Sequence, residues 1–550
     1  MKKSISLLAV ISFICLLSST SYSQSPNWLW AKNAVGTGWD DGYSVAVDAS
    51  GNAYVTGFYL SPTITFGNFT LTNAGADIFL VKYDAIGNVL WAKNGGGTTN
   101  DRGVSVAVDA SGNAYVTGYF NSSTITFGTY TLTNAGSYDI FLVKYDSSGN
   151  VLWAKSAGGT SSDDGASVAV DASGNSYVTG AFSSDTITFG SYTLTNASGT
   201  EIFLVKYDVS GNVVWATSTT GTSLDRGNSI ANDATGNVYI TGYFESPAIA
   251  FGSYILNNTD GSDIFLAKYD GNGNVIWATN AMGTSWDVGR SVAVDASGNA
   301  YVTGNFESPS ITFGSFTLTN AGFYDIFLVK YDSAGNVIWA KSSEGTDLDE
   351  GNSVAVDAVG NSYVTGAFSS PAITFGSFTL TNTSAPNFDM FLIKYDGSGN
   401  VQWATSAGGT DGDGGNSITV DVSGNSIVTG SFNSSTITFG SYFLTNTSAG
   451  VGDIFLAKSG SGNVGVDKIN NSYNISISPN PATETITIEV PTTSQHIQLS
   501  ILNFEGQKLL IHQITEHKTQ IDISSLPKGV YFVRITNDRM VEVGKFIKQH

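Results

Sequence analysis

The chain has 550 residues, with 24 Lys plus Arg against 45 Asp plus Glu and a formal net charge of −21 at pH 7. The acidic excess lies in residues 24–469, which hold 15 basic and 38 acidic residues, whereas residues 470–550 hold seven of each. A region this acidic repels phosphate backbones, so we expect no nucleic-acid partner.

The N-terminus predicts export. Residues 1–23 begin with two lysines, continue with an apolar stretch over 5–17 and end on small serines before Gln24, which is typical of a secretory signal peptide. The stretch is too short to span a bilayer, and no other apolar run approaches that length, so no transmembrane segment is expected. The single cysteine, Cys15, lies inside this peptide. The mature chain is therefore expected to have no thiol, disulfide or thiolate metal site.

Between residues 27 and 463 one segment recurs seven times. Its tryptophan stands at Trp30, Trp91, Trp153, Trp215, Trp277, Trp339 and Trp403, at spacings of 61, 62, 62, 62, 62 and 64 residues. A fixed period of this length indicates a repeat architecture whatever the chain length suggests about domain number. The last copy lacks the tryptophan segment, while an extra one, 28–32, precedes the first copy. Complementary ends of this kind predict a closed ring.

Each copy predicts one small antiparallel sheet. In the first copy, predicted strands over 44–48 and 53–57 flank an Ala-Ser-Gly-Asn turn, and strands over 77–83 and 89–93 flank a second turn with Gly-Asn. Both alternating sets of side chains in 77–83 are mainly apolar, so both faces of each sheet need cover. Burying each large apolar side chain stabilises by about 1.5 to 3 kcal/mol. A β-solenoid is the main alternative, but its coils usually have about 20 to 30 residues and need end caps.

The repeated phrases S-V-A-V-D-A-S-G-N-A-Y-V-T-G and D-I-F-L-V-K-Y-D-x-x-G-N-V-L-W-A-K resemble the bacterial β-propeller repeat known as SBBP. The resemblance implies an all-β fold over 24–463, a seven-bladed β-propeller in which an N-terminal strand closes the last blade, and no particular activity. The chain departs from shorter repeats of that kind by an insertion, T-I-T-F-G over 63–67 and T-L-T-N over 70–73, which predicts an extra hairpin.

The last segment, 475–550, has a different character. It reads P-N-P-A over 479–482, N-F-E-G-Q-K over 503–508, L-P-K-G-V-Y over 526–531 and K-F-I-K over 545–548. Its short alternating runs predict a small Ig-like β-sandwich of about seven strands. The segment 464–474 is expected to be a linker.

The four motifs in this order resemble the type A C-terminal sorting domain of the type IX secretion system. The resemblance implies that the type IX machinery is a partner, and that the chain passes through the periplasm and is then secreted or attached to the outer-membrane surface. The sorting residues that it implies are Pro479, Asn480, Pro481, Gly506, Gly529, Tyr531, Lys545 and Lys548.

The connector between copies repeats G-T-x-x-D-x-G-x-S and supplies one aspartate per copy. We expect these side chains to form a ring near the mouth of the central channel. The aspartates are Asp40, Asp101, Asp163, Asp225, Asp287, Asp349 and Asp413. Such a ring suits Ca²⁺ or a cationic ligand. The alternative is that each carboxylate accepts hydrogen bonds from its own Gly-rich loop, as in an Asx turn. No cofactor other than this Ca²⁺ is expected.

The residue before each aspartate differs from copy to copy, and two copies place a tryptophan there, Trp39 and Trp286. An exposed tryptophan beside carboxylates suits stacking against a carbohydrate, whereas packing under the inserted hairpin is the plainer interpretation. The D-A-S-G-N turns share part of a calcium loop but lack its distal Glu, so we interpret them as hairpin turns. The repeated tryptophans, such as Trp91, are expected to pack between sheets.

Function is left with three hypotheses. The first is a secreted or surface-attached, non-enzymatic and monomeric protein that binds a polysaccharide, a protein or a surface component. The second is a carboxylate-based glycosidase or lyase, which needs one asymmetric acid pair about 5 to 9.5 Å apart. The third is a purely structural surface coat. All four histidines, His496, His512, His517 and His550, lie beyond the repeats, so any chemistry there would rely on other side chains.

Overall fold

The computed structural model describes two separate units of the chain, 1–462 and 463–550. Within them the described residues are 26–258, 260–448, 450–460, 476–489, 497–503, 508–514, 516–537 and 540–549. The predicted signal peptide, the predicted linker and Gly506 lie outside these ranges. Every regular element that the described residues form is a β-strand.

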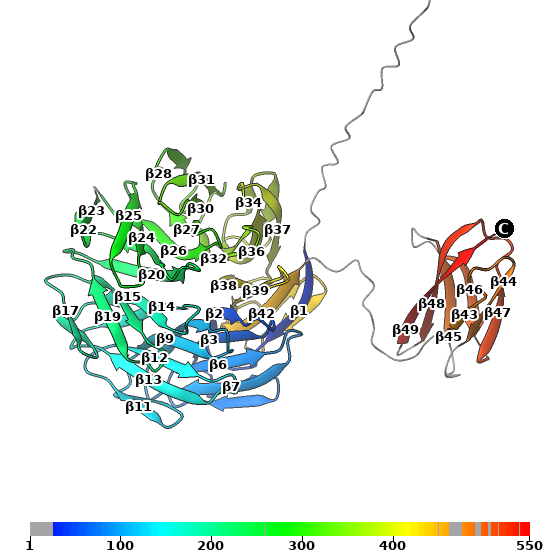
Figure 1. Ribbon diagram of the computed structural model, residues 1–550, viewed down its shortest axis with the longest axis horizontal. Coiled ribbons are helices and arrows are strands. Elements are labelled where there is room, and N and C mark those ends of the chain that lie inside the picture. The colour runs from blue at the N-terminus through cyan, green and yellow to red at the C-terminus, as the bar shows by residue number, and fades with distance from the viewer. Residues whose placement is uncertain are drawn as a thin grey trace, which may run out of the picture. The chain divides into compact units, whose positions relative to one another are not determined.

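The first unit contains seven four-stranded antiparallel sheets that follow one another around a common centre (Figure 1). The first strand of each sheet contacts the first strands of its two neighbours, and β2 contacts β38, so these strands form the inner circle. The inner strands are β2 (Asp40–Val47), β8 (Asp101–Val108), β14 (Asp163–Val170), β20 (Asp225–Asn232), β26 (Asp287–Val294), β32 (Asp349–Val356) and β38 (Asp413–Val420).

The second and third strands carry most of the buried surface of each sheet. The second strands are β3 (Ala53–Tyr59), β9 (Ala114–Phe120), β15 (Ser176–Phe182), β21 (Val238–Phe244), β27 (Ala300–Phe306), β33 (Ser362–Phe368) and β39 (Ser426–Phe432). The third strands are β6 (Asp77–Tyr83), β12 (Asp139–Tyr145), β18 (Glu201–Tyr207), β24 (Asp263–Tyr269), β30 (Asp325–Tyr331), β36 (Asp389–Tyr395) and β42 (Asp453–Gly460). All seven residues of β6 are buried, which confirms that both faces of the sheet are covered.

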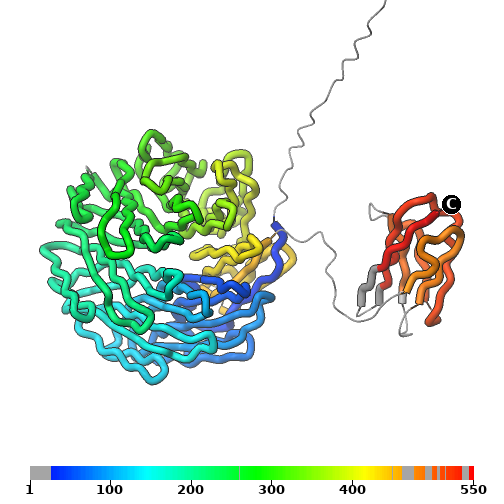
Figure 2. Tube along the Cα trace, viewed as in Figure 1, coloured from blue at the N-terminus to red at the C-terminus, as the bar shows by residue number. Residues whose placement is uncertain are grey.

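The fourth strand is the outer edge of each sheet. In six sheets it follows the third strand along the chain: β7 (Val89–Gly95), β13 (Val151–Ala157), β19 (Val213–Ser218), β25 (Val275–Ala281), β31 (Val337–Ser342) and β37 (Val401–Ala407). In the seventh sheet its place is taken by β1 (Asn27–Asn33), which pairs with β42 from Asn27↔Gly460 to Asn33↔Phe455. Figure 2 shows this blue N-terminal strand beside the last repeat. The expectation that the N-terminal segment completes the last copy is confirmed.

Hydrogen bonds also run around the inner circle. The serine that follows a bulge in each inner strand accepts the backbone N–H of the next inner strand, as in Val106 N to Ser44 Oγ, 3.1 Å. The seventh bond, Val45 N to Ser417 Oγ at 3.2 Å, joins the first sheet to the last. The apolar core also joins the first sheet to the last, because one cluster contains Val45 of the first sheet with Trp30 and Ile454 of the last. The first and last copies therefore meet through the same contacts as adjacent copies.

The turns at one end of every sheet follow one design, which we call the turn end. Asp84 Oδ1 accepts the N–H groups of Ile86 and Asn88, and its Oδ2 accepts the Asn88 side-chain amide at 2.9 Å. Gly87 has a φ of 86°, a left-handed conformation that glycine adopts without strain. Its position also lies against the Trp30 ring, where a Cβ would come within 3.0 Å. These residues therefore form tight turns that also seal the sheet junction, as the hairpin interpretation predicts.

The tryptophans bind the neighbouring copy. Trp91 Nε1 donates to the Ser147 carbonyl in the next sheet, 3.1 Å away, and Trp30 makes the equivalent bond to Ala85 across the closure. The Trp91 ring also meets Tyr54 edge-on at 6.0 Å. The expectation that these tryptophans pack between sheets is confirmed.

The insertion in each copy forms a separate two-stranded hairpin, as predicted. The hairpins are β4 (Thr63–Phe66) with β5 (Phe69–Thr72), β10 (Thr124–Phe127) with β11 (Tyr130–Thr133), β16 (Thr186–Phe189) with β17 (Tyr192–Thr195), β22 (Ala248–Phe251) with β23 (Tyr254–Asn257), β28 (Ser310–Phe313) with β29 (Phe316–Thr319), β34 (Ala372–Phe375) with β35 (Phe378–Thr381), and β40 (Thr436–Phe439) with β41 (Tyr442–Thr445). The connectors lie beside them, since Thr65 N bonds to the Val35 carbonyl.

The second unit contains two antiparallel sheets. One has the order β43 (Ser476–Ser478), β44 (Thr485–Glu489), β47 (Lys518–Asp522), and the other β46 (Lys508–Ile514), β45 (Ile497–Leu502), β48 (Gly529–Asn537), β49 (Met540–Lys548). Ile486 and Ile488 of the first sheet and Val533 and Phe546 of the second belong to one apolar cluster. Two sheets that share one core agree with the predicted sandwich, while its Ig-like relationship stays a prediction.

Candidate functional site

The seven connector aspartates are buried. Each is the first residue of an inner strand, so Asp40 pairs with Tyr59 in the sheet and does not lie in the preceding loop. Their exposed fractions are between 0% and 1%. The strand therefore begins four residues earlier than the predicted 44–48, and the carboxylates at its start are covered by protein. A ligand-binding ring of these aspartates near the channel mouth stays a prediction.

Each aspartate accepts hydrogen bonds from a serine about 20 residues further along the chain. Asp101 Oδ1 accepts the N–H groups of Asn121 and Ser122, both at 3.1 Å, and its Oδ2 accepts Ser122 Oγ at 2.7 Å. The serines in this role are Ser61, Ser122, Ser184, Ser246, Ser308, Ser370 and Ser434. Asp101 Oδ2 also accepts the N–H of Gly97 from its own loop. The hydrogen-bonding alternative thus describes these contacts, although most donors come from the segment before the hairpin.

A second buried acid lies beside each aspartate, at the start of the third strand of the preceding sheet. Burial, together with a smaller effect of the neighbouring Asp101 carboxylate, raises the pKa of Asp77 to about 6. Burial and the neighbouring Asp40 carboxylate likewise raise the pKa of Asp453 to about 7, at the junction between the last sheet and the first. The second acids are Asp77, Asp139, Glu201, Asp263, Asp325, Asp389 and Asp453. Each sheet junction therefore buries one pair of carboxyl groups.

Glycine is required between the two acids of a pair. Gly283 N donates to Asp263 Oδ1 at 3.2 Å, and a Cβ on Gly283 would lie 1.9 Å from Asp287 Oδ2. No larger residue fits there, which explains the glycine at this position of the connector. Within the described ranges, no three acidic, histidine or cysteine side chains gather to hold a metal ion. A Ca²⁺ role for the connector aspartates stays a prediction.

The two predicted tryptophans are exposed. Trp39 is 54% exposed and Trp286 is 47% exposed. The Trp286 ring lies 6.1 Å from that of Tyr243 at an angle of 36°, and its backbone N–H donates to Glu307. The structure thus leaves Trp286 beside a second aromatic ring at the surface. Binding of a carbohydrate by either tryptophan stays a prediction.

The residue after each aspartate was not among the predicted site residues. The seven copies have five different residue types at this position: Asp41, Arg102, Asp164, Arg226, Val288, Glu350 and Gly414. Each pairs across the sheet with an equally variable residue of the second strand: Phe58, Tyr119, Ala181, Tyr243, Asn305, Ala367 and Ser431. These two sets of residues, together with the residue before each connector aspartate, form one surface. We call this surface the connector face. In the sequence, these variable positions contrast with the lysines, which recur at the same two positions of the repeat. That contrast could have indicated the connector face.

Charged side chains on the connector face bind one another across neighbouring sheets. Arg226 forms an ion pair with Asp164, and Arg290 Nη2 lies 3.0 Å from Glu350 Oε1. Arg102 Nη1 donates to the Tyr43 hydroxyl at 2.8 Å, and its guanidinium lies 4.3 Å from the centre of the Phe58 ring. These contacts fix the positions of side chains that belong to no repeat pattern.

A cavity of about 310 Å³ lies on the connector face between the second and third sheets. Its lining consists of Asn100, Arg102, Tyr119, Tyr138, Ser162 and Asp164. The Tyr119 and Tyr138 rings meet edge-to-face, with centroids 5.3 Å apart and an interplanar angle of 87°. The cavity therefore combines two aromatic rings with a cation, an anion and neutral polar groups.

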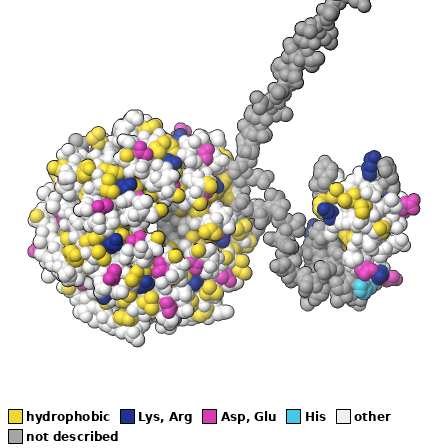
Figure 3. Space-filling model, viewed as in Figure 1, with side chains coloured by type: hydrophobic (Ala, Val, Ile, Leu, Met, Phe, Trp, Pro, Cys, Tyr) yellow, Lys and Arg dark blue, Asp and Glu magenta, His cyan; other side chains and the backbone are white. Residues whose placement is uncertain are grey.

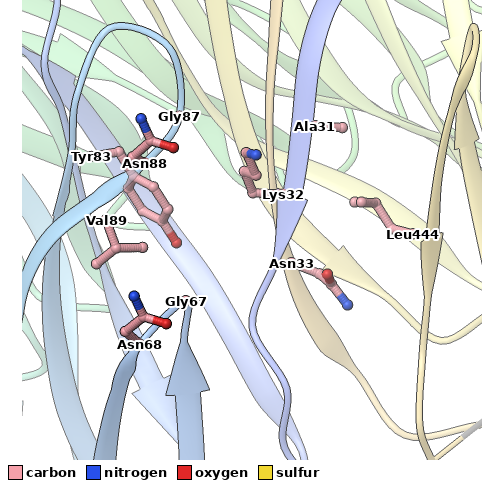
Figure 4. A pocket seen from close by; sticks show the side chains of 10 residues that line it. All are labelled: Ala31, Lys32, Asn33, Gly67, Asn68, Tyr83, Gly87, Asn88, Val89 and Leu444. Carbon is pink, nitrogen blue, oxygen red and sulfur yellow. The ribbon is translucent and has the colours of Figure 1, made fainter. Parts of the chain in front are cut away.

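Grooves of similar size lie at several sheet junctions. Figure 4 shows one of about 300 Å³ between the closing strand and the first sheet, with Lys32 of that strand and Tyr83 and Asn88 of the sheet in its lining. Equivalent residues line a groove beside Tyr331 and another beside Tyr395. Because these grooves recur with the repeat, they follow from its packing and single out no one junction. Figure 3 likewise shows acidic and basic side chains scattered singly over the face in view.

The described sorting residues lie together in the second unit. Asn480 Nδ2 donates to the Lys545 carbonyl and Asn480 Oδ1 accepts the Ile547 N–H, both at 2.9 Å. Gly529 pairs with Lys548 across the sheet, and the Lys548 ammonium donates to the carbonyl of Thr483. The motifs are thus joined by direct bonds although about 65 residues separate the first from the last.

Two further sorting contacts complete this cluster. Tyr531 stacks on Phe546 at 5.5 Å, and its hydroxyl donates to the Pro527 carbonyl at 2.6 Å. Pro479 and Pro481 are exposed on either side of Asn480. The last strand therefore holds the exposed proline segment through Asn480, and Tyr531 packs on the same strand at Phe546.

Comparison with protein families matches residues 476–549 to the secretion system C-terminal sorting domain. This domain indicates that the chain is exported by type IX secretion, to the cell surface or the medium, and that it interacts with that machinery. In the described part of the chain, no helix has the length and apolarity needed to cross a membrane.

The repeat region is similar to a WD repeat-containing protein, L264, of Acanthamoeba polyphaga mimivirus. The two are 28% identical over 507 residues, which cover 75% of this chain and 36% of the viral protein. The chain thus spans about a third of the length of that relative. Together with the repeated four-stranded sheets, the likeness is consistent with propeller blades.

Two solved structures are also similar. Sqt1 from Chaetomium thermophilum is 10% identical with a TM-score of 0.34, covering 79% of this chain and all of that one. PorZ, a surface component of the type IX secretion system of Porphyromonas gingivalis, is 10% identical with a TM-score of 0.17, covering 94% of this chain and all of PorZ. Likeness at these scores carries no argument about ligands or activity.

Proposed function

We propose that the protein is a seven-bladed β-propeller of the SBBP type that binds a polysaccharide or surface component without catalysis, after export by the type IX system. In this proposal residues 1–23 are the signal peptide, 24–463 the propeller, 464–474 the linker and 475–550 the sorting domain. The mature protein acts as a monomer, either secreted or held on the outer-membrane surface.

One observation carries the binding proposal: the differences between copies collect on the connector face. Residues that form the sheets and their junctions are nearly the same in each copy, whereas the three positions of this face range from Gly to Trp. A face built only for stability has no need of that variety, while a ligand of defined shape does. The exposed Trp39 and Trp286 fit this role, since aromatic rings supply large contact areas.

The acids of the repeats favour binding over catalysis. A glycosidase needs two carboxyl groups that reach the scissile bond. In each pair the acid of the third strand has a raised pKa, but all members of the seven pairs are between 0% and 6% exposed and the pairs recur at every junction. A substrate cannot reach them without opening a sheet junction. This supports a binding role, although the enzyme hypothesis is open to a direct test.

The test is binding of the mature protein to a glycan array and to intact cells. We expect binding that weakens when Trp39 and Trp286 are both replaced by Ser, the residue that the third copy has at this position. If the protein binds neither glycans nor cells, the structural-coat hypothesis replaces this proposal. Turnover of a polysaccharide that is abolished by one carboxyl substitution would establish the enzyme hypothesis.

Export has its own test. A chain that ends at residue 474 lacks the sorting domain, and we expect it to accumulate in the periplasm while the full chain reaches the surface or the medium. Mass spectrometry of the mature protein from culture medium and from outer membranes then shows whether it is released or attached. Equal export of both chains would contradict the role of residues 475–550.

A further inference from the structure

Two of the three arginines of the repeat region, Arg102 and Arg226, lie on the connector face, and the third, Arg290, bonds to it through Asn305 and Glu350. Between residues 24 and 469 the chain has three, Arg102, Arg226 and Arg290, whereas every lysine of that stretch except Lys468 stands at one of two positions that recur with the repeat. The lysines serve the junctions, as Lys82 does by bonding to the Ser147 carbonyl of the next sheet. The arginines therefore do not belong to the repeat pattern. One of them, Arg102, lines the cavity between the second and third sheets.

Each of these arginines has an acidic partner. Arg226 pairs with Asp164, Arg290 with Glu350, and Arg102 interacts electrostatically with Asp41. The cavity is thus close to neutral, within a region that holds 15 basic and 38 acidic residues. An anionic polymer gains no unpaired cation here and is repelled by the surroundings. A neutral ligand needs no unpaired cation and is not repelled by the acidic surroundings.

The cavity presents the groups that a sugar ring requires. Tyr119 and Tyr138, set edge-to-face, offer one aromatic face for the apolar side of a pyranose ring. The Arg102 guanidinium has five N–H donors, of which Tyr43 and Asn100 accept two, so donors are left for hydroxyl groups. Asp164 supplies acceptors, and its pairing with Arg226 fixes its position. Side chains that are already fixed lose little entropy on binding.

We propose that this cavity is the binding subsite for an uncharged sugar unit of a polysaccharide. The inference rests on the proposed function and narrows it to one pocket and one chemical class. Tyr119 and Tyr138 stack against the ring, while Arg102, Asn100 and Asp164 bind its hydroxyl groups. Its volume of about 310 Å³ is at the lower end for ligand pockets, which suits one or two sugar units of a longer chain.

The chain provides its own conservative replacements for a test. Tyr119→Ala introduces the residue that the third and sixth copies have at this position, Ala181 and Ala367, and Arg102→Val introduces the Val288 of the fifth copy. Both variants should therefore fold. The matched control is Phe443→Thr, which removes a 69% exposed aromatic ring from the hairpin β40–β41, where most copies have Thr.

The measurement is calorimetric titration of the mature protein with neutral β-glucan and xylan oligosaccharides, and with oligogalacturonate as the anionic probe. We expect the neutral probes to bind, each pocket variant to weaken that binding about tenfold, and Phe443→Thr to leave it unchanged. Unchanged binding by both pocket variants, or a preference for oligogalacturonate that salt weakens, would overturn the subsite. Binding to cell-surface proteins but to no glycan would overturn the subsite and leave the proposed function standing.

Discussion

The two ends of each sheet are built in different ways. At the turn end, the same Asp, Asn and Gly recur in each copy and bind the neighbouring copy through Trp and Lys. At the connector face, the acids beneath the surface recur while the surface residues change from copy to copy. The turn end thus serves only to join the sheets. At the connector face, buried acids join the sheets beneath surface residues that vary from copy to copy. The difference teaches that repetition marks the residues that stability needs.

The closing strand provides the largest test of this view. Deletion of residues 27–32 removes Trp30 from its cluster and leaves β42 with an unpaired edge. Losing one buried aromatic side chain alone costs about 3 to 5 kcal/mol, so we expect the melting temperature of this large unit to fall by about 5 °C or more. Differential scanning calorimetry measures it. A control that lacks residues 475–550 should keep the transition of the repeat unit, and an unchanged melt after the deletion would contradict closure by this strand.

The ends should also differ in their response to pH. At the buried pairs the pKa is raised, to about 6 for Asp139 and about 7 for Asp263, so the folded state binds protons that the unfolded state releases near pH 4. Stability from these groups is full below about pH 4 and is lost as the pH rises to about 7. At the turn end, hydrogen bonds from Asn212 and Asn336 lower the pKa of Asp208 and Asp332, so this stability is lost in more acidic solution.

Thermal melts followed by circular dichroism between pH 3 and pH 8 check this expectation. Summed over seven junctions, the buried pairs should give a melting temperature that declines from pH 5 to pH 7. The double variant Glu201→Gln and Asp225→Asn removes one pair and should make the decline shallower. A melting temperature that rises steadily over the same interval would show that the buried acids are charged in the folded protein.

Two tyrosines on one strand compare the two classes of residue directly. Tyr115 is fully buried and donates to the Gly174 carbonyl of the next sheet at 3.0 Å, whereas Tyr119 is partly exposed in the cavity. Tyr115→Ala should cost about 3 to 5 kcal/mol, and Tyr119→Ala less than about 1 kcal/mol. Urea unfolding measures both. Equal losses would mean that the variable face also supports the fold.

A carboxylate from each end gives a smaller contrast. Asp225→Ala leaves the buried Ser246 hydroxyl and N–H without their acceptor, so we expect a loss of about 2 to 3 kcal/mol. Asp208→Ala at the turn end removes bonds to Ser210 and Asn212 that water can replace, with an expected loss of about 1 kcal/mol. The unfolding free energies of both variants, measured in the same buffer, should keep this order. A larger loss at Asp208 would contradict it.

The smallest effect concerns two turn glycines. Gly149 has a φ of 81° and a Cβ there would lie 3.0 Å from the Trp91 ring, whereas Gly236, with a φ of 84°, has no atom within 4 Å of that position. Both alanine variants pay the left-handed conformational cost of about 1 kcal/mol. Gly149→Ala should lose somewhat more, because the ring must shift. Indistinguishable melting temperatures would show that the Trp–Gly contact is not tight.

The sequence allowed the sheets to be predicted because their signals are local and repeated. The spacing of the tryptophans indicated seven copies, and the extra segment at 28–32 indicated the strand that completes the seventh. The burial of Asp40 was missed because its partner, Ser61, is brought close only when the hairpin between strands folds. The pairing of Arg102 with Tyr119 depends on a register that a bulge sets between Gly103 and Ser105. Periodicity does not reveal such a register.

The pairing of β1 with β42 also sets an order of events. Asn27 and Gly460 are paired, so β1, the first strand of the repeat unit to be synthesised, must wait for a partner made more than 400 residues later. Contacts this distant in sequence form late and slowly. Until that partner is synthesised, Trp28, Leu29 and Trp30 lack their final neighbours, and this apolar segment has no sheet to pair with. Folding of the repeat unit is therefore finished by the earliest-made strand, and a chain interrupted before Gly460 has no means of completing it.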